Sequence, residues 1–270
     1  MNKNKLLSAI ENFSNLSVLV VGDVMLDVYE FCYTKYSKLI PSEKKGKRAY
    51  TSQESILSLG GAGNVAYNLS SLKVKTSLIS VCGNDSNYFA LKEIADNHNI
   101  NHFFIRDSER PTIVKTRIYI DDEYHLRKDK ENISKISDET SLSLLSEFYK
   151  QIKDTNIVIL SDYNKGIFTK FNSQKIIQKC NELKIPVIVD FKPQNKKLFQ
   201  NVTIMVPNFY KAKEVYNKFE INSDMKTSLK NISEILHCEQ VIVTLHDNGI
   251  CGYNKKEYFH IPVGCVCSIM

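Results

Sequence analysis

Three glycines and an asparagine in the stretch Leu-Gly-Gly-Ala-Gly-Asn, residues 59–64, form the part of this sequence best suited to bind a ligand. Gly60, Gly61 and Gly63 permit positive φ angles and let a ligand approach the backbone closely. The apolar spacing that follows predicts a helix, whose first N–H groups and positive dipole end attract oxygen atoms or anions. The Asn64 side chain adds a donor and an acceptor.

Three interpretations of this stretch stay open from its own residues. In the first, the glycines only make a turn that starts a helix. In the second, residues 61–66 satisfy the GxGxxG/A pattern of a dinucleotide site, with Asp85 placed for a ribose contact. That pattern normally follows the first strand directly, whereas a long segment intervenes here. In the third, Asp27 and Asn64 bind the hydroxyl groups of a sugar.

Other chemistries are excluded by motifs that the sequence lacks. It has no GxxxxGK[ST] P-loop, no HExxH and no Cys/His cluster suited to zinc. None of the six histidines lies in a Ser/His/Asp context, so a hydrolase triad is not indicated. The seven cysteines show no CxxC spacing, which favours reduced thiols in a cytoplasmic protein.

Composition limits the partners of this chain. The formal net charge of +6 mildly favours anionic ligands, but lysines are interspersed with acidic residues, so a nucleic-acid partner is not expected. No apolar run approaches the roughly 20 residues that a membrane span needs. The 270 residues and the 43% hydrophobic content are ample for one large domain.

Six runs rich in valine and isoleucine recur along the chain, and four of them end with an aspartate close to the last apolar residue. Helical patterns lie between them. This alternation predicts an α/β fold with a doubly wound, mainly parallel sheet, whose ligands bind beyond the carboxyl ends of the strands. The predicted strands are residues 16–23, 76–85, 156–163, 185–192, 202–208 and 240–247. The predicted apolar helix faces are Val65/Leu69/Leu72, Leu142/Leu145/Tyr149, Ile176/Ile177/Cys180 and Leu229/Ile232/Leu236.

Two segments break this alternation. Residues 28–58 contain aromatic and basic clusters, and residues 112–128 read as two short strands about a turn at Asp121 and Asp122. Strand pairs inserted into an α/β domain commonly form a lid over its site. We therefore expect a single domain over residues 1–270 with a small β lid built from these two segments.

Seven stretches in the same order resemble the ribokinase-like, or PfkB-type, carbohydrate kinases. Within that family they are most similar to the D-glycero-D-manno-heptose-7-phosphate kinases of lipopolysaccharide and surface-glycan synthesis. The stretches are VVGDVMLDVY (20–29), LGGAGNVAYNLSSL (59–72), RPTIVKTRIY (110–119), VILSDYNKGIFT (158–169), IPVIVDFK (185–192), VPN (206–208) and VTLHDNG (243–249). The resemblance implies a ribokinase-like fold, transfer of the γ-phosphate of ATP with Mg²⁺ to the anomeric hydroxyl of a heptose 7-phosphate, and a homodimer formed through the lid.

The resemblance also implies roles for single residues. Those expected to hold the sugar hydroxyls are Asp27, Gly60, Gly61 and Asn64. Those expected to face the phosphorylated end of the substrate are Lys115 and Arg117. Those expected on the nucleotide and phosphate side are Lys192, Asn208, Thr244 and Gly249. Asp162 and Lys165 recur in the heptose kinases, and no role is assigned to them.

Two departures from the family pattern bear on activity. Lys211 stands where the family has a glutamate tied to magnesium, and Glu214, six residues after Asn208, is an alternative that stays open. No direct metal ligand is expected in this chain. The family's Asp-x-x-Gly-Ala-Gly-Asp motif, whose amides form the anion hole and whose last aspartate is the general base, is absent, and residues 264–270 stand about where it is expected to begin.

The resemblance therefore implies that the general-base aspartate lies beyond Met270, the last residue of this sequence. We expect an incomplete, inactive kinase without a catalytic residue of its own. The alternative is a non-catalytic sugar-phosphate-binding protein or partner subunit.

Overall fold

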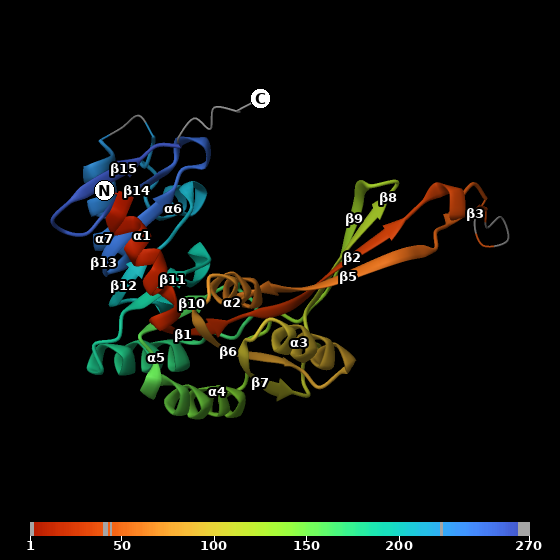
Figure 1. Cartoon of the computed structure of the whole chain (residues 1–270), viewed down its shortest axis with the longest axis horizontal. Coiled ribbons are helices and arrows are strands. Elements are labelled where there is room, and N and C mark those ends of the chain that lie inside the picture. The colour runs from red at the N-terminus through yellow and green to blue at the C-terminus, as the bar shows by residue number, and fades with distance from the viewer. Residues whose placement is uncertain (1–2, 40–42, 44, 222–223, 264–270) are drawn as a thin grey trace.

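The computed structural model describes residues 3–39, 43, 45–221 and 224–263, and a nine-stranded sheet lies at the centre of this part of the chain (Figure 1). The strand order is β15-β14-β13-β12-β11-β10-β1-β6-β7. From β13 to β7 in this order each pair of adjacent strands is parallel, and the pairs β13–β14 and β14–β15 are antiparallel. The strands are β1 (Ser17–Gly22), β6 (Lys75–Gly83), β7 (Asn101–Asp107), β10 (Ile157–Ser161), β11 (Val187–Asp190), β12 (Val202–Met205), β13 (Cys238–Thr244), β14 (Ile250–Tyr253) and β15 (Tyr258–Ile261). The predicted mainly parallel α/β sheet is confirmed.

Strand β1 shows why the apolar runs form buried strands. Its residues alternate between two cores, with Val18 and Val20 on one face of the sheet and Leu19 and Val21 on the other. Helices cover both faces, so neither set of side chains meets water, and a continuous apolar run is stable here. The helices α4 (Asp138–Gln151), α5 (Lys170–Glu182), α6 (Phe209–Val215) and α7 (Met225–Leu236) contribute to one core, and α2 (Ala62–Ser71) and α3 (Ser86–Asn97) to the other.

Two of the four predicted helix faces need correction. Helix α4 buries Leu144, Leu145 and Phe148, whereas the predicted Leu142 and Tyr149 are 57% and 40% exposed. In the sequence the buried set and the predicted set are equally apolar. Only the packing of α4 on the sheet selects between the two faces. In helix α2 the predicted Val65 and Leu69 pack, partly buried, against the core, but Leu72 is 52% exposed after the helix ends, and the fully buried residues are Ala62, Gly63 and Ala66. The faces predicted for α5 and α7 are confirmed.

A second, four-stranded sheet, which contains the two predicted lid segments and is called the lid below, projects from one side of the central sheet (Figure 1). Its order is β5 (Ser52–Gly61), β2 (Val24–Cys32), β8 (Val114–Ile120) and β9 (Glu123–Lys130), and the short pair β3 (Lys38–Leu39) and β4 (Arg48–Ala49) lies at its far end. Only Asp23 separates β1 from β2, so the chain passes straight from the central sheet into the lid. The strands therefore begin before the predicted start at residue 28.

The hairpin between β8 and β9 turns at the two predicted residues. Asp121 and Asp122 have φ angles of 50° and 65°, as a two-residue type I′ turn requires. The Asp121 carboxylate accepts hydrogen bonds from the backbone N–H and the hydroxyl of Thr34, at 3.0 and 2.8 Å, which holds this turn against the end of β2. The predicted strand pair is confirmed.

Two chemical features of the described chain bear on function. Its five described cysteines, Cys32, Cys82, Cys180, Cys238 and Cys251, are buried and unpaired, and Cys265 and Cys267 lie outside the described residues. The described helices, which include α1 (Lys3–Glu11), offer none with the length and apolar character to cross a membrane.

Candidate functional site

The strand order reverses between β1 and β10, and sheets of this type bind ligands beyond the carboxyl ends of the strands at such a reversal. Asp23 follows β1 and Asp162 follows β10. The lid sheet starts at the same place, because β2 continues from β1. The site is therefore framed by the carboxyl edge of the central sheet on one side and by the base of the lid on the other.

Pairing within the lid sheet brings together most residues predicted to bind the sugar. Met25 pairs with Gly60 across β2 and β5, and Asp27 pairs with Lys115 across β2 and β8. Arg117 Nη1 donates to Asp27 Oδ1 at 2.8 Å. A Cβ atom on Gly60 would lie 2.5 Å from Asp27 Oδ2, so the carboxylate packs directly on the glycine backbone.

Gly61 makes the change from strand β5 to helix α2. Its φ angle is 61° and its ψ angle −129°, which side chains rarely permit. A Cβ there would overlap the backbone oxygen of Asp23, which accepts the Ala62 N–H at 2.9 Å. The predicted ligand Asn64 lies exposed in the first turn of α2. Asp85 caps α3 and accepts the backbone N–H of Thr112 at 3.0 Å, which gives it a structural role in place of a ribose contact.

Lys115 is joined to the central domain through a carboxylate that sequence analysis did not single out. Its ammonium lies 2.7 Å from Asp129 Oδ2 and 3.0 Å from Glu131 Oε2. Lys165, on the loop after β10, contacts the same Glu131 oxygen at 2.8 Å. Burial raises the pKa of Glu131, but the hydrogen bonds from Lys165 and Lys115 outweigh it and leave that pKa lowered. Two cations therefore converge on one carboxylate between lid and core.

Asp23 organises the loop after β10. Its carboxylate is 3% exposed and accepts backbone N–H groups from Tyr163, Lys165 and Ile167, at 2.8, 3.2 and 3.4 Å. Burial, opposed by these hydrogen bonds and aided by the charge of Asp162, raises the pKa of Asp23 to about 6. The sequence signal was the Gly-Asp pair that ends the first apolar run.

We expect Asp23 to make stability depend on pH. Its folded pKa of about 6 lies above the ordinary 3.8, so its contribution to stability is present below pH 4 and is lost as the pH rises through 6. A shift of about two pKa units corresponds to about 3 kcal/mol. The difference in unfolding free energy between the unaltered chain and Asp23→Asn, from urea titrations, should fall by about that amount between pH 4 and pH 7. If the unfolding free energies of the two proteins changed with pH by the same amount, the raised pKa of Asp23 would be contradicted.

Asp162 links the loops that follow β10 and β11. It is 2% exposed and accepts the backbone N–H of Lys192 at 3.0 Å and the side-chain amide of Asn195 at 3.1 and 3.0 Å. It also accepts the Asn164 N–H at 2.8 Å. The residue to which no role could be assigned from sequence is therefore placed to position Lys192.

The residues predicted for the nucleotide side lie at the carboxyl ends of β11, β12 and β13. Asn208 caps helix α6 by accepting the Lys211 N–H at 2.9 Å, and it forms a parallel bridge with Thr244. Thr244 and Gly249 line one hollow of about 450 Å³ beside Ile261. The Lys192 ammonium lies 5.8 Å from the centre of the Tyr163 ring.

Tyr163 connects the sugar side and the nucleotide side, and sequence analysis did not name it. Burial raises the pKa of its phenol, and three neighbouring carboxylates raise it further. These carboxylates belong to Asp190, Asp27 and Asp23. Because Asp27 comes from the lid and Asp190 from β11, the tyrosine lies where the two predicted groups of residues meet.

The described residues do not fit a magnesium ion held directly by protein carboxylates. The Lys211 ammonium forms an ion pair with Asp190 at the end of β11. It therefore neutralises the carboxylate nearest the nucleotide side and repels a divalent cation. Among the residues that the structure describes, no group of three His, Cys, Asp or Glu side chains could hold a metal ion.

The place expected for the catalytic motif falls at the end of the sequence. The last described residues are Pro262 and Val263, which follow β15 and line the same hollow as Thr244 and Gly249. Residues 264–270, with Met270 among them, lie outside the described residues. That the general-base aspartate lies beyond Met270 therefore stays a prediction, which the structure does not test.

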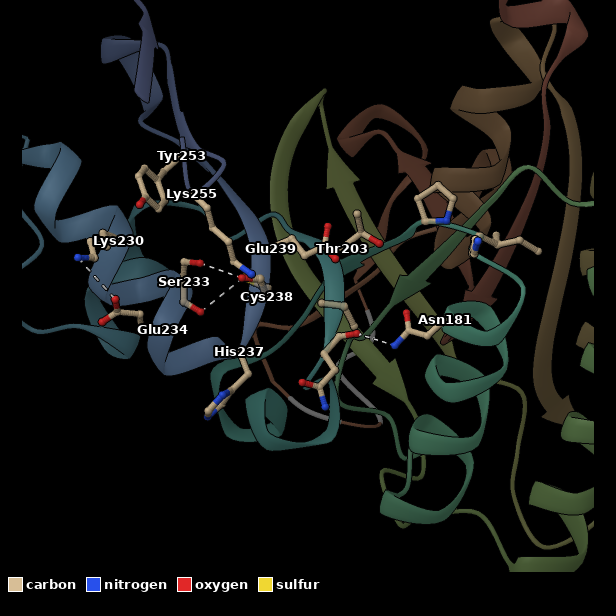
Figure 2. Close-up of a pocket in the computed structure, with 15 residues that line it drawn as sticks. Asn181, Thr203, Lys230, Ser233, Glu234, His237, Cys238, Glu239, Tyr253 and Lys255 are labelled. Carbon is tan, nitrogen blue, oxygen red and sulfur yellow. Dashed lines mark hydrogen bonds and ion pairs between the residues drawn. The ribbon is translucent and has the colours of Figure 1, made fainter. Parts of the chain in front are cut away.

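A wide groove of about 1010 Å³ lies at the opposite edge of the sheet (Figure 2). Pro186, Val202 and Cys238 line it, and they stand at the amino ends of β11, β12 and β13. Figure 2 shows Lys230 paired with Glu234, at 3.9 Å, beside this groove. Parallel sheets bind their ligands at the carboxyl edge, so we assign the groove no part in the site.

Comparisons with known proteins agree with this geometry. The sequence model of the pfkB family carbohydrate kinases matches residues 15–266. "Bifunctional protein HldE" of Nitratiruptor sp. is 32% identical over 246 residues, which are 91% of this chain and 51% of that protein. The protein of the same name from Campylobacter jejuni strain RM1221 is 35% identical over 88% of this chain and 50% of its own length. The chain thus spans about half the length of these curated relatives.

Solved structures show the same fold. Phosphofructokinase-2 from Escherichia coli in complex with fructose-6-phosphate superimposes with a TM-score of 0.70 and 15% identity, over 93% of this chain and 80% of that one. The tetrameric inhibited form of that enzyme superimposes with a TM-score of 0.71 and 14% identity, over 92% and 79% of the two chains. At 15% and 14% identity, these superpositions show a shared fold and nothing finer.

Proposed function

This chain belongs to the pfkB family of carbohydrate kinases, and from that premise we propose that it binds a heptose 7-phosphate in the crevice between lid and central sheet. The observation that carries the proposal is the Asp27 carboxylate, which lies on the bare backbone of Gly60 and is held there by Arg117. A carboxylate accepts hydrogen bonds from two neighbouring hydroxyl groups, and the missing side chain of Gly60 lets the Asp27 carboxylate lie directly on the backbone.

The phosphate of the substrate is proposed to bind at Lys115 and Lys165. Both ammonium groups contact Glu131, at 3.0 and 2.8 Å, so the two cations already converge on an anionic group. A phosphate dianion carries more charge than a carboxylate and offers more acceptor oxygens, so it can compete for the same cations. Arg117 lies on the same strand as Lys115 and adds a third cation close to the sugar.

In a complete kinase of this kind, ATP with Mg²⁺ donates its γ-phosphate to the anomeric hydroxyl of the heptose, in the synthesis of lipopolysaccharide precursors. We propose that this chain by itself does not catalyse that transfer. Its 270 residues contain the sequence Gly-Ala-Gly only at 61–63, where Asn64 follows, and an amide cannot act as the general base. The residues of this chain would then bind and orient the sugar phosphate.

A second function, as a non-catalytic sugar-phosphate-binding protein or partner subunit, is favoured by Lys211. Its positive charge on the nucleotide side departs from what a magnesium-dependent kinase uses. A homodimer through the lid is part of this proposal, because the lid exposes large apolar side chains. These are Ile56, Leu57, Tyr124 and Leu126, which are between 41% and 57% exposed. The proposed location is the cytoplasm.

Binding of heptose 7-phosphate, measured by titration calorimetry, tests this function. Lys115→Met should weaken binding about tenfold or more, because a charge-assisted hydrogen bond to the phosphate is lost. Unphosphorylated heptose should bind the variant and the unaltered chain alike. Lys128→Met, an exposed lysine on β9, is the control and should leave both affinities unchanged.

Two results would contradict the proposed function. One is an intact fold by circular dichroism with no binding of the sugar phosphate. The other is an equal loss of affinity for the phosphorylated and the unphosphorylated sugar in Lys115→Met, which would place Lys115 away from the phosphate.

A further inference from the structure

An ion pair between two elements of the central domain lies on the nucleotide side of the site. The Lys211 ammonium contacts Asp190 Oδ1, and the lysine side chain is 14% exposed while that of Asp190 is 43% exposed. Asp190 ends strand β11, and Lys211 is the third residue of helix α6, which follows β12. The pair therefore lies at the carboxyl edge of the sheet, where the ligand of such a fold binds.

The local sequence holds Lys211 in this place. Asn208 caps α6 and accepts the Lys211 backbone N–H at 2.9 Å, so the start of the helix has a defined position. Asn208 is in turn bridged to Thr244 at the end of β13. The Lys211 side chain is thus directed from a backbone held by the helix cap and by the bridge to β13, which makes its ammonium a positioned charge.

Lys192, two residues after Asp190, supplies a second cation. Phe191 is fully buried in the core, so its neighbours Asp190 and Lys192 both point to the other side of the chain. The Lys192 backbone is held by Asp162, and its ammonium lies 5.8 Å from the centre of the Tyr163 ring. Lys192 and Lys211 thus bring two cations to the end of β11, where Asp190 is paired with Lys211 and Asp162 accepts the Lys192 backbone N–H.

We propose that the Lys211 ammonium takes the electrostatic place of a divalent cation, so that this chain binds the phosphate groups of a nucleotide without Mg²⁺. In phosphoryl-transfer enzymes the metal bridges phosphate oxygens and neutralises their charge. An ammonium group supplies a compact charge with three donors, which can do the same for binding. A divalent cation placed beside Lys211 would be repelled, and Asp190 would already be paired.

This inference rests on the proposed nucleotide side, and it predicts that Asp190 lowers the affinity for a phosphate group. The Asp190 carboxylate pairs with the Lys211 ammonium, so a phosphate group that binds this ammonium must displace the carboxylate. Asp190→Asn removes the competing charge and should therefore raise the affinity for ATP several-fold. Lys211→Glu places two carboxylates side by side, which should create a need for Mg²⁺ that the unaltered chain lacks.

ATP is the probe, titrated calorimetrically into the full chain in EDTA and again in Mg²⁺. The unaltered chain should bind ATP at least as tightly in EDTA as in Mg²⁺. Lys211→Glu should weaken binding in EDTA by about 10- to 100-fold, and Mg²⁺ should restore most of it. Lys213→Glu, at a 48% exposed lysine two residues further along α6, is the matched control and should behave like the unaltered chain.

The inference is overturned if the unaltered chain requires Mg²⁺ for ATP, if Lys211→Glu and Lys213→Glu behave alike, or if ATP binds in neither buffer. Asp190→Asn with unchanged affinity would also count against it, and this variant keeps the test valid if Lys211→Glu unfolds. Heptose 7-phosphate titrated in the same buffers separates the two proposals. Sugar binding without metal-independent ATP binding removes this inference alone, and failure of both removes the proposed function as well.

Discussion

The 270-residue chain, assayed by itself, should form no ADP when ATP, Mg²⁺ and heptose 7-phosphate are supplied together. Phosphoryl transfer depends on positioning and on electrostatic stabilisation of the transferring group. A general base typically contributes about 10²- to 10⁴-fold, and a single oxyanion donor about 10²- to 10³-fold. The motif that supplies both in the family is absent from residues 1–270, so a loss of at least about 10⁴-fold is expected.

A coupled assay for ADP release measures this directly. The control is calorimetric binding of heptose 7-phosphate by the same sample, which shows that missing turnover does not come from a misfolded site. Sugar-dependent ADP formation that disappears in Asp27→Asn would contradict the prediction, because it would require a base and an anion hole among the residues that end at Met270.

Alanine at two adjacent glycines should produce opposite defects. At Gly61 a side chain is forced to a φ angle of 61° and against the backbone oxygen of Asp23, so Gly61→Ala should destabilise the fold by about 3 kcal/mol or more. At Gly60 the new methyl meets side-chain atoms of Asp27 and Met25, which can move. Gly60→Ala should therefore keep most of the stability but displace the Asp27 carboxylate and weaken sugar binding about tenfold or more.

Urea unfolding and calorimetry on the two variants separate these effects. Because the residues are neighbours and the substitution is the same, each variant is the control for the other. A loss of sugar binding in Gly61→Ala alone, or similar stabilities for the two variants, would contradict the prediction. Gly61 would then not be the glycine needed for stability, or Gly60 not the one needed for sugar binding.

Several elements of the fold were predictable because the signals that produce them are local. The six buried strands follow from continuous apolar runs, and the β8–β9 turn follows from Asp121 and Asp122, which adopt positive φ more readily than most residues. The position of the crevice followed from strand–helix alternation, since parallel strands end at one edge. The face of α4 was not predictable, because Leu142 and Leu144 are equally apolar and only packing on the sheet selects between them.

Some residues of the candidate site were likewise predictable from the sequence, and others were not. The residue types on the sugar side were visible in the sequence, where Asp27, Gly60 and Lys115 lie in short family-like stretches. Glu131 was missed, and Asp190 was expected only as one of the aspartates that end the predicted strands, because the partners of both residues are distant in sequence. Glu131 joins Lys115 to Lys165, and Asp190 pairs with Lys211. No periodicity or spacing encodes such pairs.

By itself, the sequence determined the alternating α/β architecture, the lid hairpin and the chemical types at the crevice, because hydrophobic period and turn preference act over a few residues. Only the tertiary structure decided which charges meet and which are buried. Burial and the charge of Asp162 raise the pKa of Asp23 to about 6, and Lys211 is neutralised because α6 brings its ammonium against Asp190 at the end of β11. Ion-pair partners and desolvation depend on long-range packing, which a reading of neighbouring residues does not contain.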